Sequence, residues 1–319
     1  MTVELASLEE LEPALAREEF DVARVFIGYA ASAPSAPEPC RIPKVAYSLE
    51  RPASATGSFR TGEWHTTWSP AAYAGAIDTV REAIREGDVY QVNLVQHLWA
   101  DFAGDPLALA TALAPLRPLE GAALQGDGWT IVSASPELLL QKRGKVVRTS
   151  PIKGTRPAGV PIESDKDTAE HVMIVDLERN DLSRVCVPGT VRWPELLAER
   201  QLAGVTHLVG TVEGELRPDV TLTELLEAVL PGGSVTGCPK SSALELIAAL
   251  EPVGRGASMG ALGRIYANGD LDLALTIRTF AVVDTEIHLW VGGGIVWDSV
   301  ADAEIEESWV KARPLLALA

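Results

Sequence analysis

The sequence predicts an α+β protein built on mixed or antiparallel sheets. Segments with strand patterns alternate irregularly with helical segments and hairpins, instead of following the regular strand–helix repeat of a parallel sheet. The chain has 319 residues, of which 47% are hydrophobic, so it can bury a large core and is not disordered. Its length suits one large domain or two small ones, and it contains no internal repeat.

Local signals predict where the helices lie. Ser69 and Pro70 open one helix as N-cap and first residue, and Gly87 ends it. Residues 165–185 carry apolar side chains at helical spacing, among them Met173 and Leu177. Further helices are expected at residues 224–230, at residues 239–251 and from about residue 302 to near the C-terminus.

Strands are predicted by short apolar runs between turn residues. Residues 143–145 read as a hairpin turn, with Gly144 at its centre. Residues 30–63 are rich in Pro, Ala and Ser, so we expect loops there around one or two short strands. The predicted strands lie at residues 89–98, 129–133, 138–140, 145–148, 273–277 and 287–291.

Charge and composition exclude several classes of function. The net charge of −17 argues against nucleic acids and anionic membranes as partners. No apolar run is long enough to span a membrane, and the first residues are acidic where a signal peptide would be basic. Three cysteines, odd in number and far apart, suggest neither a disulfide framework nor a zinc site. We therefore expect a cytoplasmic protein, in which an anionic substrate would need a metal ion, arginine or backbone N–H groups.

One lysine stands in an unusual place. Lys153 lies between Ile152 and Gly154, directly after a predicted strand. A lysine held by backbone on both sides can serve as a nucleophile if its amine is kept neutral. A solvated lysine on a surface turn is the simpler interpretation of this stretch taken alone.

A glycine-rich stretch, residues 232–237, leads directly into a predicted helix. The first backbone N–H groups of such a helix, here those of Lys240, Ser241 and Ser242, can bind an anion. A plain turn is an equally good interpretation, and the spacing differs from that of a nucleotide phosphate loop.

Carboxylates on two predicted helices could bind a cation. Glu304 and Glu307 lie three residues apart on the last helix, hence on one face, and Lys311 follows one turn later. Glu170 opens another helix. Hard oxygen ligands of this kind suit Mg²⁺, although solvated glutamates are the commoner case.

Three further features could contact a ligand. His207 lies in an apolar setting, where most histidines are packed and hydrogen-bonded. Arg278 follows an apolar strand and could hold a carboxylate or form a structural ion pair. The run from Gly292 to Gly294 lets the backbone approach a ligand closely.

Taken together, these segments resemble the chorismate-utilising enzymes, which include anthranilate synthase component I, aminodeoxychorismate synthase component I and the isochorismate and salicylate synthases. The matches follow the family's order from about Trp68 to the C-terminus, which makes the set far more specific than any one motif. They are GDVYQVNL at 87–94, SPE at 135–137, PIKGTRP at 151–157, AEHVMIVDLERNDL at 169–182, PGGSVTGCPK at 231–240, IRT at 277–279 and GGGIV at 292–296 with Asp298 and Ser299.

Within this family, the lysine of the PIKGT motif is typical of aminodeoxychorismate synthase component I. Anthranilate synthases usually carry alanine at that position, and isochorismate-forming relatives carry a lysine base at the position of Gln91. The resemblance therefore implies that Lys153 attacks ring carbon C2 of chorismate while the C4 hydroxyl leaves. Ammonia then adds at C4 and expels the lysine, which gives 4-amino-4-deoxychorismate, a product on the route to p-aminobenzoate and folate.

The resemblance also implies the roles of the other residues. Glu137 matches the general acid, and His207 matches the active-site histidine. Mg²⁺ and Arg156 would lower the pKa of Lys153. Glu170 and Glu307 match the Mg²⁺ ligands, and Glu304 a ligand through water. The residues that match substrate-binding positions are Thr155, Gly237, Cys238, Arg278, Gly292, Gly294 and Lys311.

The implied architecture is a single chorismate-binding domain of two packed, mostly antiparallel sheets flanked by helices, with the active site between the sheets. Residues 1–66 would form a short N-terminal part, and residues 67–319 the catalytic core. A separate glutamine amidotransferase subunit would supply the ammonia. The short N-terminal part predicts no tryptophan pocket for feedback inhibition.

One departure from the family and two alternatives complete the interpretation. Ser258 stands where the family usually has tyrosine, so this part of the pocket should be open or rebuilt. The enzyme alternative is an anthranilate synthase component I. The alternative from another class is a catalytically inactive chorismate-binding subunit, against which the joint presence of Lys153, Glu137, Glu170 and Glu307 speaks.

Overall fold

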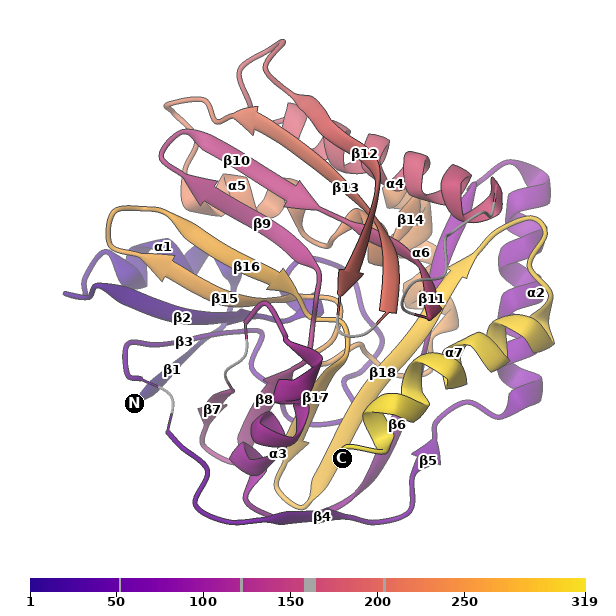
Figure 1. The fold of residues 1–319 in the computed structure, drawn as a ribbon, viewed down its shortest axis with the longest axis horizontal. Helices are drawn as coiled ribbons and strands as arrows, with labels where there is room; N and C mark the ends of the chain where they lie inside the picture. Colours follow the sequence, from indigo (N-terminus) through magenta and orange to yellow (C-terminus); the bar gives the residue numbers. More distant parts are fainter. Residues whose placement is uncertain (52, 121–122, 158–164, 203–204) are drawn as a thin grey trace.

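Two antiparallel sheets form the protein. The computed structural model describes residues 1–51, 53–120, 123–157, 165–202 and 205–319. The two sheets face each other, with helices on their outer sides and at their edges (Figure 1). This confirms the α+β fold of two packed antiparallel sheets.

The first sheet has ten strands, and all of its described pairings are antiparallel. Its order is β1-β3-β2-β15-β16-β9-β10-β13-β11, with β12 also paired to β13. Their bounds are β1 Thr2–Leu5, β2 Val22–Ile27, β3 Val45–Ser48, β9 Leu138–Arg143, β10 Val146–Ser150, β11 Ile152–Pro157, β12 Arg192–Leu202, β13 Val205–Glu215, β15 Ala261–Tyr266 and β16 Leu271–Leu275.

The second sheet has eight strands in the order β14-β6-β18-β17-β8-β7, with the short strands β4 and β5 paired to β6. Its two longest strands, β6 and β18, run side by side over ten residue pairs and form its centre. The bounds are β4 Phe59–Thr61, β5 His65–Thr66, β6 Gln91–Gly104, β7 Leu124–Gly126, β8 Trp129–Ser133, β14 Gly237–Cys238, β17 Thr279–Val283 and β18 Glu286–Ile295.

Helix α2 begins and ends at residues with clear capping chemistry. Ser69 caps α2 by accepting a hydrogen bond from the Ala72 N–H, and Gly87 ends it in a left-handed conformation, as predicted. Helix α6 begins one residue later than predicted, with Pro239 as its N-cap. The helices are α1 Leu11–Leu15, α2 Pro70–Glu86, α3 Pro106–Leu113, α4 Asp165–Ser183, α5 Leu222–Val229, α6 Lys240–Leu250 and α7 Ala301–Leu316, with short 3₁₀ turns η1 Leu8–Glu10, η2 Tyr29–Ala31, η3 Ala114–Leu116 and η4 Gly233–Val235.

Side chains alternate between two hydrophobic clusters along the strands of the second sheet. In β8 and β17, Ile131 and Ala281 join the large cluster shared with the ten-stranded sheet. Their neighbours Val132 and Phe280 join a smaller cluster under α3 and α7. This period of two is expected for strands buried on both faces. The larger cluster therefore holds the two sheets together.

The first three strands, within residues 1–48, are part of the first sheet. Strand β2 pairs with β15, and β1 and β3 extend the sheet beyond it. One or two short strands were expected within residues 30–63, and two, β3 and β4, are found there. Strand β2 was not predicted: it alternates in burial from Val22 to Val25 and then continues as a short apolar run, with Arg24 inside it.

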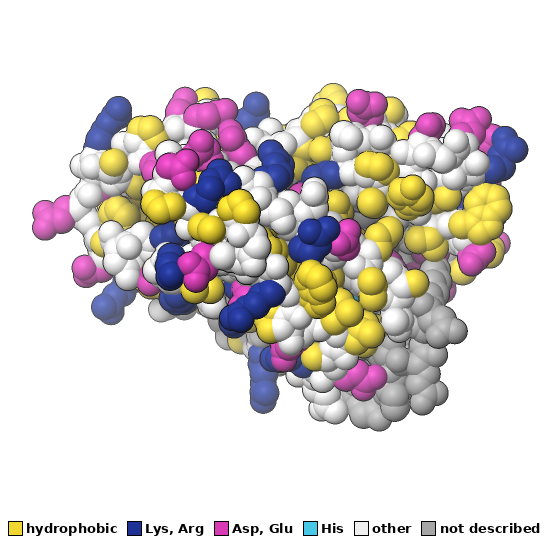
Figure 2. Space-filling view, turned by 90° about the horizontal axis from the view of Figure 1, so that it is seen from above, with side chains coloured by type: hydrophobic (Ala, Val, Ile, Leu, Met, Phe, Trp, Pro, Cys, Tyr) yellow, Lys and Arg dark blue, Asp and Glu magenta, His cyan; other side chains and the backbone are white. Residues whose placement is uncertain are grey.

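One face of the molecule carries both charged and hydrophobic side chains (Figure 2). Figure 2 shows acidic and basic side chains interspersed on one face, although the net charge is −17. Within the residues that the structure describes, no helix is both long enough and apolar enough to cross a bilayer.

Candidate active site

Lys153 lies in β11 of the first sheet and reaches toward the edge of the second. Its Nζ donates a hydrogen bond to Glu170 Oε1 of α4 at 2.7 Å. The same carboxylate oxygen accepts a second hydrogen bond from Gln91 Nε2 of β6 at 2.8 Å. Both side chains of the ion pair are only 14% exposed, so this pair is largely shielded from water. One lysine thus connects both sheets through a single carboxylate.

Glu137 lies close to the lysine in the loop between β8 and β9. Its buried carboxylate accepts a hydrogen bond from Ser234 Oγ at 2.6 Å. The carbonyl oxygen of the same serine lies 3.4 Å from Lys153 Nζ. Ser234 therefore contacts both groups, through its side chain on one side and its backbone on the other. The sequence interpretation gave this serine no role, although it lies inside the glycine-rich stretch.

Burial controls the protonation of Glu137. Removal from water raises the pKa of this carboxyl to about 7, although the Ser234 hydrogen bond and the charges of Lys153 and Arg278 act in the opposite direction. A carboxyl group with such a pKa can hold a proton near neutral pH and release it during a reaction, as a general acid must.

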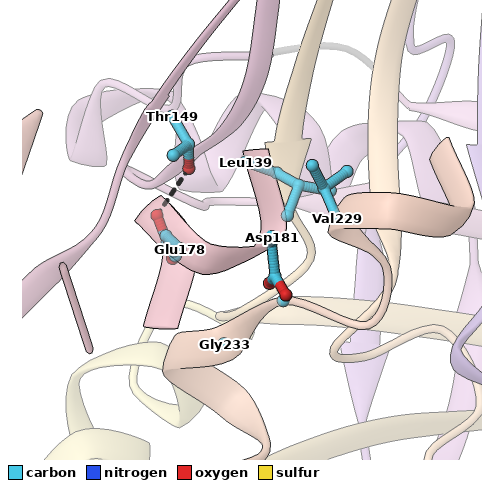
Figure 3. A pocket seen from close by; sticks show the side chains of 7 residues that line it. Leu139, Thr149, Glu178, Asp181, Val229 and Gly233 are labelled. Atoms are coloured by element: carbon cyan, nitrogen blue, oxygen red, sulfur yellow. Dashed lines mark hydrogen bonds between the residues drawn. The ribbon is translucent and has the colours of Figure 1, made fainter. Parts of the chain in front are cut away.

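A second buried carboxyl supports the turn that carries Ser234. Glu178 of α4 accepts a hydrogen bond from Thr149 Oγ1 at 2.7 Å and lines a cavity of about 10 Å³ behind Gly233 (Figure 3). Burial holds the pKa of Glu178 well above its ordinary value, although the Thr149 hydrogen bond and the charge of Lys240 act in the opposite direction. Beside it, Asp181 pairs with Lys240 at 2.5 Å. This cavity has room for about one water, so it is too small to hold a substrate.

His207 of β13 is buried and hydrogen-bonded on both ring nitrogens. Nδ1 lies 2.7 Å from the carbonyl oxygen of Gly154, and Nε2 lies 3.4 Å from a guanidinium nitrogen of Arg278. Because a carbonyl only accepts, the proton of the neutral ring sits on Nδ1, and Nε2 accepts from Arg278. Burial also lowers the pKa of His207, which favours this neutral form. The histidine therefore orients Arg278.

The predicted glycines lie where no side chain fits. A Cβ added to Gly292 or Gly237 would overlap the backbone of β6, and one added to Gly294 would overlap the Gln91 side chain and approach Glu170 Oε1. Gly237 and Cys238 form β14 and pair with Val92 and Gln91. The backbone therefore closes tightly around one end of β6, next to the Lys153–Glu170 pair.

The acidic pair on α7 lies over β18. Glu304 is buried and accepts a hydrogen bond from Ser299 Oγ at 2.6 Å. Glu307 is more exposed and pairs with Lys311 at 2.8 Å, and Lys311 Nζ also donates to the Gly292 carbonyl. The position that a Cβ atom would occupy on Gly293 lies 3.4 Å from Glu307 Oε1 and 3.7 Å from Glu304 Oε2. These two carboxylates thus face the same spot.

The carboxylate and amide oxygens of this site are chemically of the kind that binds a hard divalent cation. Three carboxylates surround the end of β18, and the buried Gln91 Oε1 has no hydrogen-bond partner among the described residues. Oxygen ligands of this type are those of Mg²⁺. In the described part of the chain, however, no three such side chains lie close enough to share one ion. Lysines pair with two of the carboxylates instead.

Without a metal ion, the pKa of Lys153 is raised, whereas the implied mechanism needs it lowered by Mg²⁺ and Arg156. Burial does disfavour the charged amine, but the carboxylates of Glu170, Glu137 and Glu307 together outweigh it and raise the pKa. The sequence shows the lysine but not how many carboxylates surround it. Arg156 was the other expected cause, and its side chain lies outside the described part of the structure.

Two further expectations concern the edges of the site. Thr155 lies in β11, but its side chain is outside the described residues. Ser258, in the place of the family's tyrosine, is fully buried and donates a hydrogen bond to the Thr276 carbonyl at 3.0 Å. This part of the pocket is therefore rebuilt and closed, not open.

The chain is similar in sequence to known proteins. Residues 20–317 match the family model of chorismate binding enzymes. The chain is 43% identical over 78% of its length to anthranilate synthase component 1 of Thermus thermophilus, of which it covers 56%. It is 37% identical over 80% of its length to aminodeoxychorismate synthase component 1 of Escherichia coli, of which it covers 59%. The chain thus spans little more than half the length of these curated relatives.

A solved structure extends the similarity to the fold. The crystal structure of anthranilate synthase component I from Streptococcus pneumoniae superposes with a TM-score of 0.84 at 26% identity. The match covers 98% of this chain and 86% of that one. Both sheets described above are therefore shared with that structure.

Proposed function

Because the chain belongs to the chorismate-binding enzyme family, we propose that it aminates chorismate with ammonia to 4-amino-4-deoxychorismate, as an aminodeoxychorismate synthase. The observation that carries this proposal is the placement of Lys153. Its amine lies inside the site, 3.4 Å from the carbonyl oxygen of Ser234. The hydroxyl of the same serine donates a hydrogen bond to Glu137. A nucleophile and a proton donor thus share one small space between the sheets.

In the first step, the Lys153 amine forms a bond to ring carbon C2, and the bond from C4 to its hydroxyl oxygen breaks. Glu137 gives its proton to the departing oxygen, which leaves as water. Before its lone pair can attack, the lysine must leave Glu170 and give one proton of its ammonium to water. Splitting one difficult substitution in this way is the general advantage of covalent catalysis.

In the second step, ammonia bonds to C4 and the bond between C2 and the lysine nitrogen breaks. The carboxylate of Glu137, left by the first step, can take the proton that the new C4 ammonium gives up. Arg278, oriented by His207, and the backbone around Gly237 and Gly292 would hold the substrate carboxylates. These contacts would fix C2 and C4 between the lysine and the acid.

Glu170, Glu304 and Glu307 would hold Mg²⁺. When bound, this ion supplies positive charge that anchors a substrate carboxylate and templates the reacting ring. The carboxylates come from α4 and α7, on either side of the end of β18. The residues of the chain would then orient the substrate from three sides.

A separate glutamine amidotransferase would supply the ammonia. Relatives that carry the words "component 1" in their names fit this arrangement. We expect the purified chain to aminate chorismate with an ammonium salt and not with glutamine. Turnover with glutamine by this chain alone would contradict the two-subunit arrangement.

The alternative is an anthranilate synthase, favoured by the 43% identity to such an enzyme. The two reactions place the amino group at different carbons, so the products decide between them. The experiment is mass spectrometry and NMR of the product formed from chorismate, Mg²⁺ and an ammonium salt. A para-type amino product at C4 supports the proposal, and an ortho-amino product supports the alternative.

A further inference from the structure

We propose that Lys153 competes with the divalent cation for Glu170, so that cation binding releases the lysine for its reaction. This inference rests on the metal site of the proposed function and adds a coupling between two of its parts. It assigns Lys153 a second role, as the cation that holds the metal-binding carboxylate in place until the metal arrives.

The contacts of Glu170 carry this inference. Its Oε1 accepts from both Lys153 Nζ at 2.7 Å and Gln91 Nε2 at 2.8 Å. An oxygen that already accepts two hydrogen bonds has no free lone pair for a metal ion. Mg²⁺ needs its ligands at about 2.1 Å in a nearly octahedral arrangement. The ammonium and the metal ion therefore cannot both sit on this oxygen.

Charge adds to this geometric conflict. If the ion used the other oxygen of the same carboxylate, two cations would still lie within a few ångströms of each other. Water screens this repulsion poorly, because the Lys153 and Glu170 side chains are each only 14% exposed. The affinity of the cation should thus rise when the lysine charge is removed.

A second lysine at the same site provides an internal comparison. Lys311 pairs with Glu307 at 2.8 Å, but these side chains are 39% and 51% exposed. Water screens this pair more strongly, and such exposed pairs contribute little. The two lysines therefore contact two carboxylates of one proposed metal site, with very different degrees of burial.

The coupling must act in both directions. If the lysine weakens cation binding, the cation weakens the lysine–carboxylate contact by the same factor. Lys153 would then turn from Glu170 toward the space beside Glu137, where the ring of the substrate would lie. In this way the nucleophile would become available only after the charge that anchors the substrate is in place.

The test measures cation binding without turnover. Purified protein is stripped with EDTA, and binding of Mn²⁺ as a probe for Mg²⁺ is followed by electron paramagnetic resonance in the absence of chorismate. We expect Lys153→Met to bind Mn²⁺ on the order of tenfold more tightly than wild type. Lys311→Met should change the affinity by about threefold or less, and Glu170→Gln should weaken binding in either background.

Each outcome decides a different part of the proposal. Equal Mn²⁺ affinity in wild type and Lys153→Met would overturn the competition while leaving the metal site intact. No binding by either protein would overturn both the metal site and the competition. Thermal melting verifies that each variant is folded. Lys153→Gln, with a shorter neutral side chain, should show the same direction of change if Lys153→Met does not fold.

Discussion

Glu137 shows how a single buried residue can control the chemistry of this site. Its carboxyl is removed from water and accepts hydrogen bonds from the Ser234 hydroxyl and the Ile152 backbone. Burial raises its pKa to about 7, while Ser234 and nearby cations limit the rise. An acid must carry its proton to act, so activity should fall as the pH rises through this pKa.

Replacing Glu137 with Gln should remove the proton donor without changing the shape of the site. We expect kcat with ammonium to fall by about 10²–10⁴-fold, with little change in the affinity for chorismate. Glu227→Gln, at an exposed position on α5, is the matched control and should behave like wild type. Full activity in Glu137→Gln would exclude this residue as the acid.

Ser234→Ala tests the hydrogen bond itself. The serine hydroxyl stabilises the charged carboxylate, so its loss should raise the pKa of Glu137 further. The limb of the pH–rate profile on which activity falls should therefore move to higher pH, while kcat decreases because the acid is less well oriented. If kcat decreases but this limb of the pH–rate profile stays at the same pH, Ser234 contributes only to the packing of the site.

At the scale of elements, one buried arginine joins the active-site turn to the central strand. Arg255, after α6, donates to the Val235 carbonyl of η4 and to the Asn93 carbonyl of β6, both at 2.7 Å. Its charge is balanced by Glu251, and its guanidinium stacks 4.7 Å from the ring centre of Tyr29. The turn that carries Ser234 is thereby fixed against the strand that carries Gln91.

Breaking this pair should be costly. Arg255→Met leaves the buried Glu251 carboxylate with the Val95 N–H but without a cation, which should lower the free energy of unfolding by about 3–5 kcal/mol. In the double variant Arg255→Met, Glu251→Met, no charge is left behind, so most of that stability should return. Chemical denaturation of both variants checks this. A double variant as unstable as the sum of the two single ones would contradict it.

Elements with local signals could be predicted from the sequence. Helix α2 begins and ends at the predicted residues, because Ser69, Pro70 and Gly87 determine its ends within the chain itself. Strand β6 extends six residues beyond its predicted end at residue 98, because its pairing with β18 continues through polar positions such as Asp101. Strand pairing depends on distant segments, which local patterns do not reveal.

The candidate site was predictable in its residues but not in its contacts. Motif order identified Lys153, Glu137 and Glu170. The sequence could not show that Ser234 lies between the lysine and the acid, or that Gln91 shares an oxygen of Glu170 with Lys153. These contacts join β6, β11, α4 and η4, which are far apart in the chain. Only the packing of the two sheets brings them together.

At the scale of the whole molecule, the pairing of β6 with β18 buries two histidines. His97 Nε2 lies 3.2 Å from His288 Nδ1. Thr67 Oγ1 contacts the other ring nitrogen of His97, Nδ1. Burial lowers the pKa of His97 to about 3 and that of His288 to about 4. Both rings are therefore neutral in the folded protein at pH 5, whereas an unfolded chain would protonate them below about pH 6.5.

This difference predicts that acid weakens the fold. Between pH 6.5 and 4 the unfolded chain binds more protons, so stability is full above this window and falls as the pH decreases through it. Each histidine should account for about 2 kcal/mol between pH 6.5 and 5. Thermal melts of His288→Gln should depend less steeply on pH than those of wild type. The exposed His65→Gln should keep the wild-type slope, and an equal slope in all three proteins would contradict this account.

The most direct test of the proposed chemistry is the intact mass of the protein after a denaturing quench with chorismate and Mg²⁺ but no ammonia. Covalent attack by Lys153 predicts an adduct with the mass of chorismate less one water, mapped by peptide digestion to Lys153 and missing in Lys153→Ala. Adding an ammonium salt before the quench should remove the adduct and yield the C4 amino product. Wild type without any adduct, together with an ortho-amino product formed equally well by Lys153→Ala, would contradict the proposed function.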